Sequence, residues 1–401
     1  MALNKRIKRH IWSRDHSFLV TQIAQLREIC TGEMRAEGLA IIRETDHGIY
    51  FSGKIEDVYR AHLRLRSASR IWLCLDNFKA GAREELFRKT ASIPWELLLN
   101  PGVPLDVSAR VRYSRLKHEG ETAATITEAI MRRFRESGER ASPETGTSAE
   151  TEPRQRIHGS VEKDRVELRI DLSGPHLHKR GYRLQQGAAP LRETLAAGIV
   201  QWGLDIWHEK HPGSPWPRRI HDPFCGSGTI LIEAEILRTG IAPGSMREFL
   251  FMQQPHFRAA AFEYLRRETH DRGEGHPECG ISGSDYSAEI IESARGNSAA
   301  AGVKIDFTVS DAFKSFDHEI FGPETLIISN PPYGERLPEG GAALYRRLLG
   351  KLKDTGTSGV IIVPRSLEAE LSFSGTIQRL NFTNGGIPVS AIYLEQDFSG
   401  P

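Results

Sequence analysis

Four consecutive residues, Asn330, Pro331, Pro332 and Tyr333, have types and an order that could perform chemistry on a nucleobase. An exocyclic amine of a base is a poor nucleophile because its lone pair is delocalised into the ring. The Asn330 side-chain oxygen and the Pro331 carbonyl can accept the two amine hydrogens, and the prolines stiffen the loop. Tyr333 offers a ring on which an extruded base can stack. We therefore expect these four residues to position an amine for attack, without a strong base. A Pro-Pro turn that only closes a strand is the structural alternative.

A second segment, 222–229 with the sequence DPFCGSGT, lies between a predicted strand and a predicted helix. Its two glycines permit a tight turn and a close approach of a ligand to the backbone. The dinucleotide fingerprint GxGxxG is absent, because Leu231 stands where the third glycine would be. A purely structural turn is one interpretation. The other is a site for a nucleoside cofactor without a pyrophosphate, namely S-adenosylmethionine.

Two acidic residues, Asp285 and Asp311, end the next two predicted strands. Asp285, which Tyr286 follows, can accept hydrogen bonds from both hydroxyls of a ribose. Asp311, which Ala312 follows, can accept one from an adenine amine. Each acid could instead cap a helix, since Asp is a preferred N-cap residue. Their occurrence on successive strands after a glycine turn favours an adenosyl pocket.

The elements that must position these residues alternate between strand and helix after residue 174. We expect strands over 218–222, 280–285, 305–309, 325–329 and 359–363, helices over 229–237, 288–300 and 343–352, and a hairpin over 376–398. This alternation predicts an α/β fold with a doubly wound, mostly parallel sheet that binds ligands at the carboxyl ends of its strands.

The first part of the chain has shorter and more mixed segments. Helical spacing covers 18–29 and 126–134, and strand-like runs cover 39–42, 48–52, 71–75, 107–111 and 166–172. This mixture predicts an α+β region. The segment 137–156 is rich in Ser, Thr, Glu, Pro and Gly and lacks large apolar residues, so we expect a polar loop there.

Charge is distributed unevenly along the 401 residues, although the net charge is only +1. Residues 1–180 hold 32 basic and 25 acidic side chains, whereas 181–401 hold 21 and 27. Such asymmetry indicates a part that faces nucleic acid. Basic clusters in the first part, which either are solvated or contact phosphate, are Arg64, Arg66 and Arg70, and Arg132, Arg133 and Arg135.

Other classes of protein fit the composition poorly. No apolar run reaches the ~18–20 residues of a membrane helix, and no secretory signal is evident. The four cysteines form no CxxC pair, so we expect neither disulfides nor a metal site. Cys225 lies in the glycine turn, but amine methylation needs no covalent thiolate, and we expect it to be a packing or cofactor-lining residue. The sequence predicts a cytoplasmic protein without a membrane or metal partner.

With these residues stated, the sequence resembles a known family. Segments 222–234 (DPFCGSGTILIEA) and 329–337 (SNPPYGERL) are similar to the THUMP-domain class I methyltransferases, and more narrowly to the bacterial 23S ribosomal RNA guanine-N2 methyltransferase group. Segments 178–183 (HKRGYR) and 189–198 (APLRETLAAG) resemble the stretch that leads into the methyltransferase fold in this family. The resemblance is strongest over 173–337.

The resemblance implies three domains: a ferredoxin-like region over 1–57, a THUMP-type RNA-binding domain over 58–172, and one Rossmann-like methyltransferase domain over 173–401. It implies S-adenosylmethionine as the cofactor and Asn330, Pro331, Pro332 and Tyr333 as the residues that hold the target amine. The residues it implies around the cofactor are Pro190, Glu193, Asp222, Pro223, Phe224, Cys225, Gly226, Ser227, Gly228, Thr229, Asp285, Tyr286, Asp311, Ala312 and Asn330.

The function that follows is S-adenosylmethionine-dependent methylation of guanine N2 in RNA, with 23S ribosomal RNA or a pre-ribosomal particle as the partner. Three alternatives stay open at this point. A THUMP module also fits a transfer-RNA guanine-N2 methyltransferase. The same Asn-Pro-Pro-Tyr loop could serve an adenine-N6 methyltransferase. A non-catalytic RNA-binding protein could keep the fold.

Overall fold

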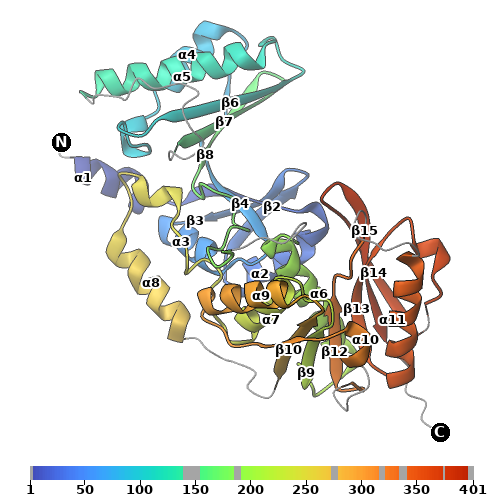
Figure 1. Ribbon diagram of the computed structural model, residues 1–401. Coiled ribbons are helices and arrows are strands. Elements are labelled where there is room, and N and C mark those ends of the chain that lie inside the picture. Colours follow the sequence, from blue (N-terminus) through green and yellow to red (C-terminus); the bar gives the residue numbers. More distant parts are fainter. Residues whose placement is uncertain are drawn as a thin grey trace. The chain divides into compact units, whose positions relative to one another are not determined.

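A computed structural model describes residues 3–138, 154–184, 191–271, 279–315, 321–333, 341–373 and 375–395 (Figure 1). Its contacts define two compact units. The first unit comprises residues 1–24, 31–177 and 247–267, and the second comprises 25–30, 178–246 and 268–401. The domain boundaries at 57 and 172 stay a prediction, and most of the polar loop, 139–153, lies outside the described residues.

The first unit is built on one sheet of eight strands, in the order β2-β3-β1-β4-β8-β7-β6, with β5 beside β8. The strands are β1 (His16–Gln22), β2 (Ala40–Thr45), β3 (Gly48–Gly53), β4 (Ala68–Cys74), β5 (Phe78–Lys79), β6 (Leu105–Arg112), β7 (Gln155–Glu162) and β8 (Arg165–Asp171). Strands β6 and β7 are parallel, whereas β4, β8 and β7 pair in antiparallel fashion. The α+β character predicted for this part is confirmed.

The helices of this unit include α1 (Leu3–Ile7), most of α2 (Arg27–Ala36), α3 (Ile55–Arg64), α4 (Arg83–Ala91) and α5 (Glu119–Glu136). Figure 1 shows α4 and α5 running along one side of β6 and β7. A Cβ on Gly159 of β7 would lie 2.7 Å from Ile126 Cδ1 of α5, so the glycine allows the helix to pack closely on that face. The residues directly before and after Gly159, which are His158 and Ser160, therefore point to the opposite face of the sheet.

The predicted helix over 18–29 is wrong in its first half. Strand β1 occupies His16–Gln22, and helix α2 begins only at Arg27. The cause is burial on both faces: Phe18, Leu19 and Val20 are fully buried between β3 and β4. A strand buried on both faces loses its alternation of apolar and polar residues, and its short apolar run then resembles one turn of a helix.

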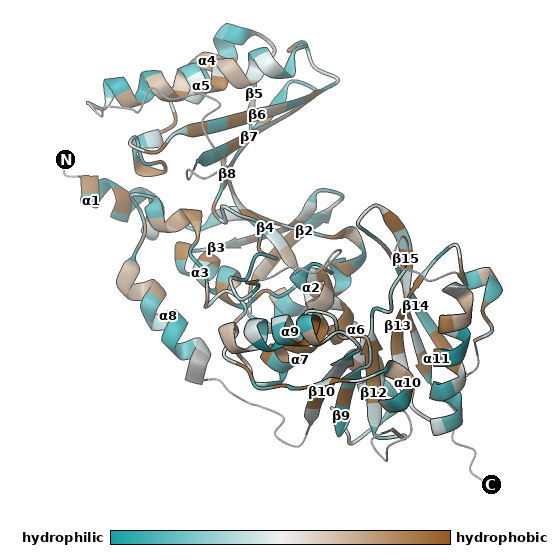
Figure 2. Cartoon of the chain, in the orientation of Figure 1, coloured by the Kyte–Doolittle hydropathy of each residue, from teal (hydrophilic) through white to brown (hydrophobic). Residues whose placement is uncertain are grey.

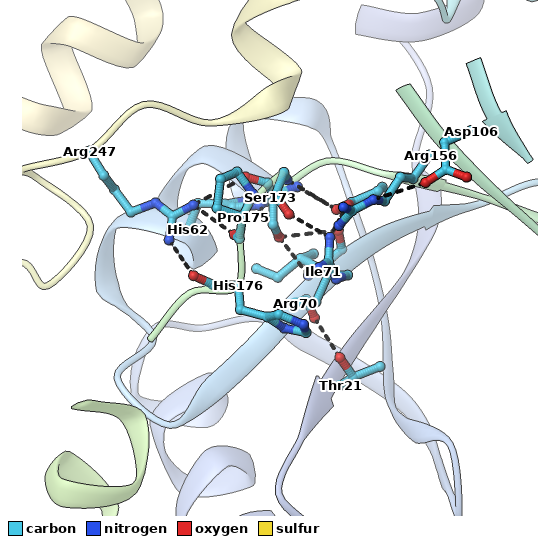
Figure 3. Close-up of polar contacts among 12 residues, drawn as sticks. Thr21, His62, Arg70, Ile71, Asp106, Arg156, Ser173, Pro175, His176 and Arg247 are labelled. Atoms are coloured by element: carbon cyan, nitrogen blue, oxygen red, sulfur yellow. Dashed lines mark hydrogen bonds and ion pairs between the residues drawn. The ribbon is translucent and has the colours of Figure 1, made fainter. Parts of the chain in front are cut away.

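A buried polar network holds the end of β8 against β4 in the first unit (Figure 3). Arg70 forms an ion pair with Asp171 and donates to the Gly174 carbonyl at 2.6 Å. The Ser173 hydroxyl accepts from the Ile71 amide at 2.8 Å and lies 3.0 Å from His62 Nε2. Burial lowers the pKa of His62 to about 3, so its ring stays neutral.

This network corrects the interpretation of the first basic cluster. Arg70 is only 5% exposed, so it is neither solvated nor open to phosphate. Arg64 binds Glu37 at 2.9 Å, and Arg133 of the second cluster binds the buried Glu96 at 2.9 Å. These arginines therefore form internal ion pairs of the fold.

The segment 247–267, which lies between two stretches of the second unit in the sequence, packs within the first. Arg247 donates to the carbonyls of Pro175 at 2.8 Å and His176 at 2.7 Å (Figure 3). The Phe251 ring stacks on Tyr59 of α3 with centroids 4.8 Å apart, and Phe262 of α8 (Ala259–Asp271) meets the same tyrosine edge-on. Aromatic packing therefore anchors this segment to α3.

The second unit is built on a seven-stranded sheet in the order β11-β10-β9-β12-β13-β15-β14. Its strands are β9 (Arg219–Asp222), β10 (Gly280–Asp285), β11 (Asp306–Val309), β12 (Thr325–Ser329), β13 (Ser358–Pro364), β14 (Thr376–Asn384) and β15 (Ile387–Glu395). The first five are parallel to one another, and β15 pairs in antiparallel fashion with both β13 and β14. The sheet is thus mostly parallel and reverses its order between β9 and β12, as the α/β prediction requires.

The helices of the second unit are α6 (Glu193–Lys210), α7 (Thr229–Arg238), α9 (Ala288–Ala300), α10 (Ala312–Ser315) and α11 (Gly341–Thr355). Figure 2 shows hydrophobic residues concentrated on strands such as β13 and β15, while α11 mixes both kinds. Within the described parts of the chain, no helix is long and apolar enough to cross a bilayer.

Candidate active site

The glycine turn connects β9 to α7 in the second unit. Gly226 has a φ of 54° and Gly228 a φ of 83°, both in the left-handed region that favours glycine. A Cβ on Gly228 would lie 3.0 Å from Phe307 Cζ, whereas none of the neighbouring atoms lies within 4 Å of a Cβ on Gly226. The backbone at Gly226 therefore faces open space, which is what a cradle for a ligand requires.

Strand β10 lies directly beside this turn because it carries a glycine there. A Cβ on Gly283 would lie 2.3 Å from Leu231 Cδ1 and 2.9 Å from Cys225 Cβ. The Cys225 amide donates to the Ser284 carbonyl at 3.0 Å, and the Gly226 amide donates to Asp285 Oδ2 at 3.2 Å. Two hydrogen bonds thus fix the turn to the carboxyl end of β10.

Asp222, at the end of β9, is buried at the base of the turn. Its Oδ1 accepts from Ser329 Oγ at 2.6 Å and from the Phe224 amide at 3.0 Å. Burial raises the pKa of Asp222 to about 7 from an ordinary 3.8, and the charge of Asp285 adds to the rise. Ser329 ends β12, so this carboxyl group joins the two strands between which the sheet reverses its order.

The two acids at strand ends have different surroundings. Asp285 Oδ1 accepts from the Ser287 amide at 3.0 Å, and Tyr286 beside it is 81% exposed. Asp311 is exposed, and its Oδ1 accepts from the Phe313 amide at 2.9 Å, where it caps the short helix α10. The cap that we weighed against a ligand role is therefore formed by Asp311. The Ser310 amide donates to the Asp285 carbonyl at 2.9 Å, which holds the two strand ends together.

Asn330 follows β12, and its Oδ1 is buried without a hydrogen-bond partner among the described residues. A buried amide oxygen without a partner costs about 1–3 kcal/mol, so this atom has a binding capacity that the fold itself does not use. Pro331 is buried, and Pro332 and Tyr333 are half-buried. The Tyr333 hydroxyl accepts from Asn384 Nδ2 at 2.6 Å, which fixes the ring from the end of β14.

A buried charged cluster supports the turn from below. Arg183 donates to Thr229 Oγ1 at 2.9 Å, and its Nε lies 3.2 Å from Oε1 of Glu193, which is the first residue of α6. Burial raises the pKa of Glu193, although the charge of Arg183 opposes the rise. Behind them, Tyr182 donates to Glu233 Oε1 at 2.9 Å. The cluster therefore joins the starts of α6 and α7.

The predicted residues thus gather at the carboxyl ends of β9, β10, β11 and β12. Pro190 lies outside the described residues. Glu193 contributes an ion pair beneath the turn. Burial raises the pKa of the Cys225 thiol well above its ordinary value, so the thiol stays protonated and is a packing residue, as expected. No group of metal-binding side chains occurs in the described ranges.

Two residues of the site were missed by sequence reasoning. Ser329 is the partner of Asp222, and Asn384 is the partner of Tyr333. Asn384 precedes Gly385 and Gly386, and an Asn-Gly pair between two strands predicts a hairpin turn. That signal places Asn384 at the tip of the hairpin, but nothing local in the sequence connects it to Tyr333.

Comparison with family models decides the classification. Residues 180–376 match the model described as RMKL-like, methyltransferase domain, and residues 17–72 match the RlmL ferredoxin-like domain. The chain belongs to the RMKL-like methyltransferase family. The family resemblance predicted from the two motifs is therefore confirmed, together with the α/β fold class.

The curated relatives of this chain are longer than the chain itself. The chain is 33% identical over 332 residues to "Ribosomal RNA large subunit methyltransferase K/L" of Psychromonas ingrahamii, covering 80% of this chain and 42% of that protein. The chain spans less than half the length of the curated relatives it matches.

Among the solved structures that cover almost the whole chain are the following two. One, from Listeria monocytogenes, is named a predicted N6-adenine-specific DNA methylase; it is 31% identical with a TM-score of 0.78, over 96% of this chain and 97% of that one. The other, SMU.472, is a methyltransferase in complex with SAH; it is 28% identical with a TM-score of 0.79, over 96% of this chain and 100% of that one.

Proposed function

We propose that this chain transfers a methyl group from S-adenosylmethionine to the exocyclic N2 amine of a guanine in RNA, with 23S ribosomal RNA as the substrate. The observation that carries the proposal is the buried, unpartnered Oδ1 of Asn330 at the carboxyl end of β12. This acceptor stands one residue from Ser329, which binds the base of the glycine turn.

The residues around the turn fit the cofactor. Gly226 faces open space, so a ligand can approach its backbone. The carboxylate of Asp285 lies at the adjacent strand end, where it can accept from ribose hydroxyls. The ring of Tyr286 is exposed and can stack on the adenine, and the exposed Asp311 lies at the next strand end. When bound, S-adenosylmethionine supplies an electrophilic methyl group on a sulfonium.

The chain's own residues prepare the amine. Asn330 Oδ1 and the Pro331 carbonyl accept hydrogen bonds from its two N–H groups, which withdraws the nitrogen lone pair from conjugation with the base. Tyr333, held by Asn384, stacks on the extruded base. With S-adenosylmethionine held at the glycine turn and Asp285, this nitrogen would receive the methyl group, and one amine proton would leave through Asn330 Oδ1 or the Pro331 carbonyl to water. Asp222 is buried and bonded to Ser329, so it is not the base.

The choice of RNA rests on the basic first part of the chain and on the names of the curated relatives. We place the reaction in the cytoplasm, on ribosomal RNA or a pre-ribosomal particle. A transfer-RNA guanine is the closest alternative. An adenine N6 amine is a further candidate, because it presents the same planar geometry and the Listeria neighbour is named for it.

The test is to incubate the purified chain with S-adenosylmethionine carrying a deuterated methyl group and three separate pools: ribosomal RNA, transfer RNA and DNA. Nucleosides are then identified by mass spectrometry. The proposal predicts deuterated N2-methylguanosine in the ribosomal pool. N2-methylguanosine only in the transfer-RNA pool would support the first alternative, and N6-methyladenosine without methylguanosine would contradict the amine assignment.

A further inference from the structure

The face of the first unit's sheet opposite α5 presents side chains suited to nucleic acid. Along β6 the exposed residues on this face include Ser108, Arg110 and Arg112, and His158 of β7 lies beside Ser108 in register. Since Gly159 packs against Ile126 of α5, its neighbour His158 points to this opposite face. The same face continues across β8 to β4.

Two aromatic rings meet on this face. Trp72 of β4 and His158 of β7 are both half-buried, and their ring centroids lie 6.3 Å apart. Ser108 Oγ lies 3.0 Å from His158 Nδ1, which fixes the orientation of that ring. The Arg70 guanidinium carbon lies 5.6 Å from the Trp72 ring centroid, and Arg70 itself is anchored by Asp171. The rings therefore form a supported, partly exposed platform.

Cations surround this platform. Arg110 and Arg112 are exposed and make no ion pair with any acidic side chain that the structure describes, although Glu162 of β7 lies opposite Arg112 in register. Arg156 is paired with Asp106 at 3.3 Å. Burial lowers the pKa of His158, and the nearby charges of Arg169 and Arg110 lower it further. Burial is the largest cause of this pKa shift and the charge of Glu119 opposes it, so the positive charge of the face rests on the exposed positions of Arg110 and Arg112 themselves.

We propose that this face, defined by Trp72, His158, Arg110 and Arg112, binds an unpaired segment of the RNA substrate. Bases stack on the two rings and phosphates contact the two arginines. The face spans β4, β8, β7 and β6, about 14 Å at the usual strand spacing, which is wide enough for more than one nucleotide. A duplex keeps its base faces stacked inside, so it cannot use the rings.

This inference rests on the proposed function only in taking RNA as the substrate, and its test measures binding without methyl transfer. The full chain is titrated into a fluorescein-labelled unpaired oligoribonucleotide of about 12 nucleotides, and anisotropy gives the affinity at several salt concentrations. The variant Arg110→Gln/Arg112→Gln is expected to bind more weakly, with a log–log salt slope less steep by about 1.4, since each single-strand phosphate contact contributes about 0.7.

The matched control is Arg35→Gln/Arg88→Gln, which removes the same charge from exposed positions on α2 and α4. It should leave the salt slope unchanged. Equal slopes for the parent and the Arg110/Arg112 variant, or an equal change in the control, would overturn the proposal.

A second pair of variants tests stacking. Trp72→Leu should weaken binding of the unpaired probe by at least about fivefold, whereas Trp72→Phe should stay within about twofold of the parent. Binding of a duplex of the same sequence should respond to neither variant. An equal loss with the duplex, or no loss with the unpaired probe, would contradict stacking on Trp72. Failure of methylation with intact RNA binding would instead overturn only the proposed function.

Discussion

The variant Asp222→Asn tests the buried carboxyl group beneath the glycine turn through its effect on stability. The amide oxygen can keep both hydrogen bonds that Asp222 Oδ1 accepts, from Ser329 Oγ and the Phe224 amide. What the variant removes is the ability to ionise. In the folded state burial raises the pKa of Asp222 from 3.8 to about 7. The folded protein therefore holds a proton that the unfolded chain releases.

The sign and magnitude follow from this difference. Between pH 4 and pH 7 the folded state binds more protons than the unfolded state at Asp222, so this residue lowers the free energy of unfolding as pH rises. A rise of about three pKa units corresponds to about 4 kcal/mol at 1.36 kcal/mol per unit. Asparagine does not ionise, so the variant does not lose this free energy of unfolding as the pH rises. The variant should match the parent near pH 4 and exceed it by up to about 4 kcal/mol at pH 8.

The assay is urea unfolding of parent and variant at closely spaced pH values, followed by tryptophan fluorescence, to which the second unit contributes Trp202, Trp207 and Trp216. Other groups titrate in both proteins, including the buried His221, so only the difference between the two curves is used. Asp306→Asn, which makes the same substitution at an exposed acid on β11, is the control, and the change with pH at Asp222 is measured relative to it. A pH-independent difference for Asp222→Asn would refute the buried, protonated carboxyl group.

Three further outcomes are expected. Asn330→Ala should bind S-adenosylhomocysteine like the parent in calorimetry while single-turnover methyl transfer falls by about 100-fold or more, the usual cost of losing one positioned polar group; a parent-like rate would remove Asn330 as the amine acceptor. Asp285→Ala should weaken cofactor affinity by about 10- to 150-fold, since hydrogen bonds to charged groups contribute about 1.5–3 kcal/mol; unchanged affinity would contradict the ribose assignment. Asn384→Ala should raise the KM for RNA without changing cofactor affinity, because Tyr333 loses its 2.6 Å anchor; a parent-like KM would show that this anchor does not hold the base.

The catalytic half of the fold was predictable because its strands are short, buried and followed by turn residues. The strands over 280–285 and 325–329 and the helix over 288–300 have the predicted bounds. Both strands end at or beside a polar residue, and the carboxyl ends of strands are where parallel sheets bind their ligands. The same reasoning placed Asp222, Asp285 and Asn330 at one edge of the sheet.

Long-range partners were not predictable in the same way. Whether Arg70 meets solvent or Asp171 depends on which strands become neighbours, and the two residues are 101 positions apart. Asn384 reaches Tyr333 because β15 pairs in antiparallel fashion with β13, which brings the tip of the β14–β15 hairpin to the carboxyl end of the parallel strands. The segment 247–267 packs on α3 through Tyr59, about 190 residues earlier, as its aromatic contacts show. Local sequence patterns do not predict such long-range contacts.

The central claim is that the methyl group goes to the N2 amine of a guanine. The most direct measurement compares two RNA transcripts of the same sequence, one with guanosine and one with inosine in its place, which differs only by the absence of the 2-amino group. Both are incubated with the chain and labelled S-adenosylmethionine, and the nucleosides are analysed by mass spectrometry. We predict labelled N2-methylguanosine from the first transcript and no label in the second. Equal incorporation into both transcripts would contradict the account.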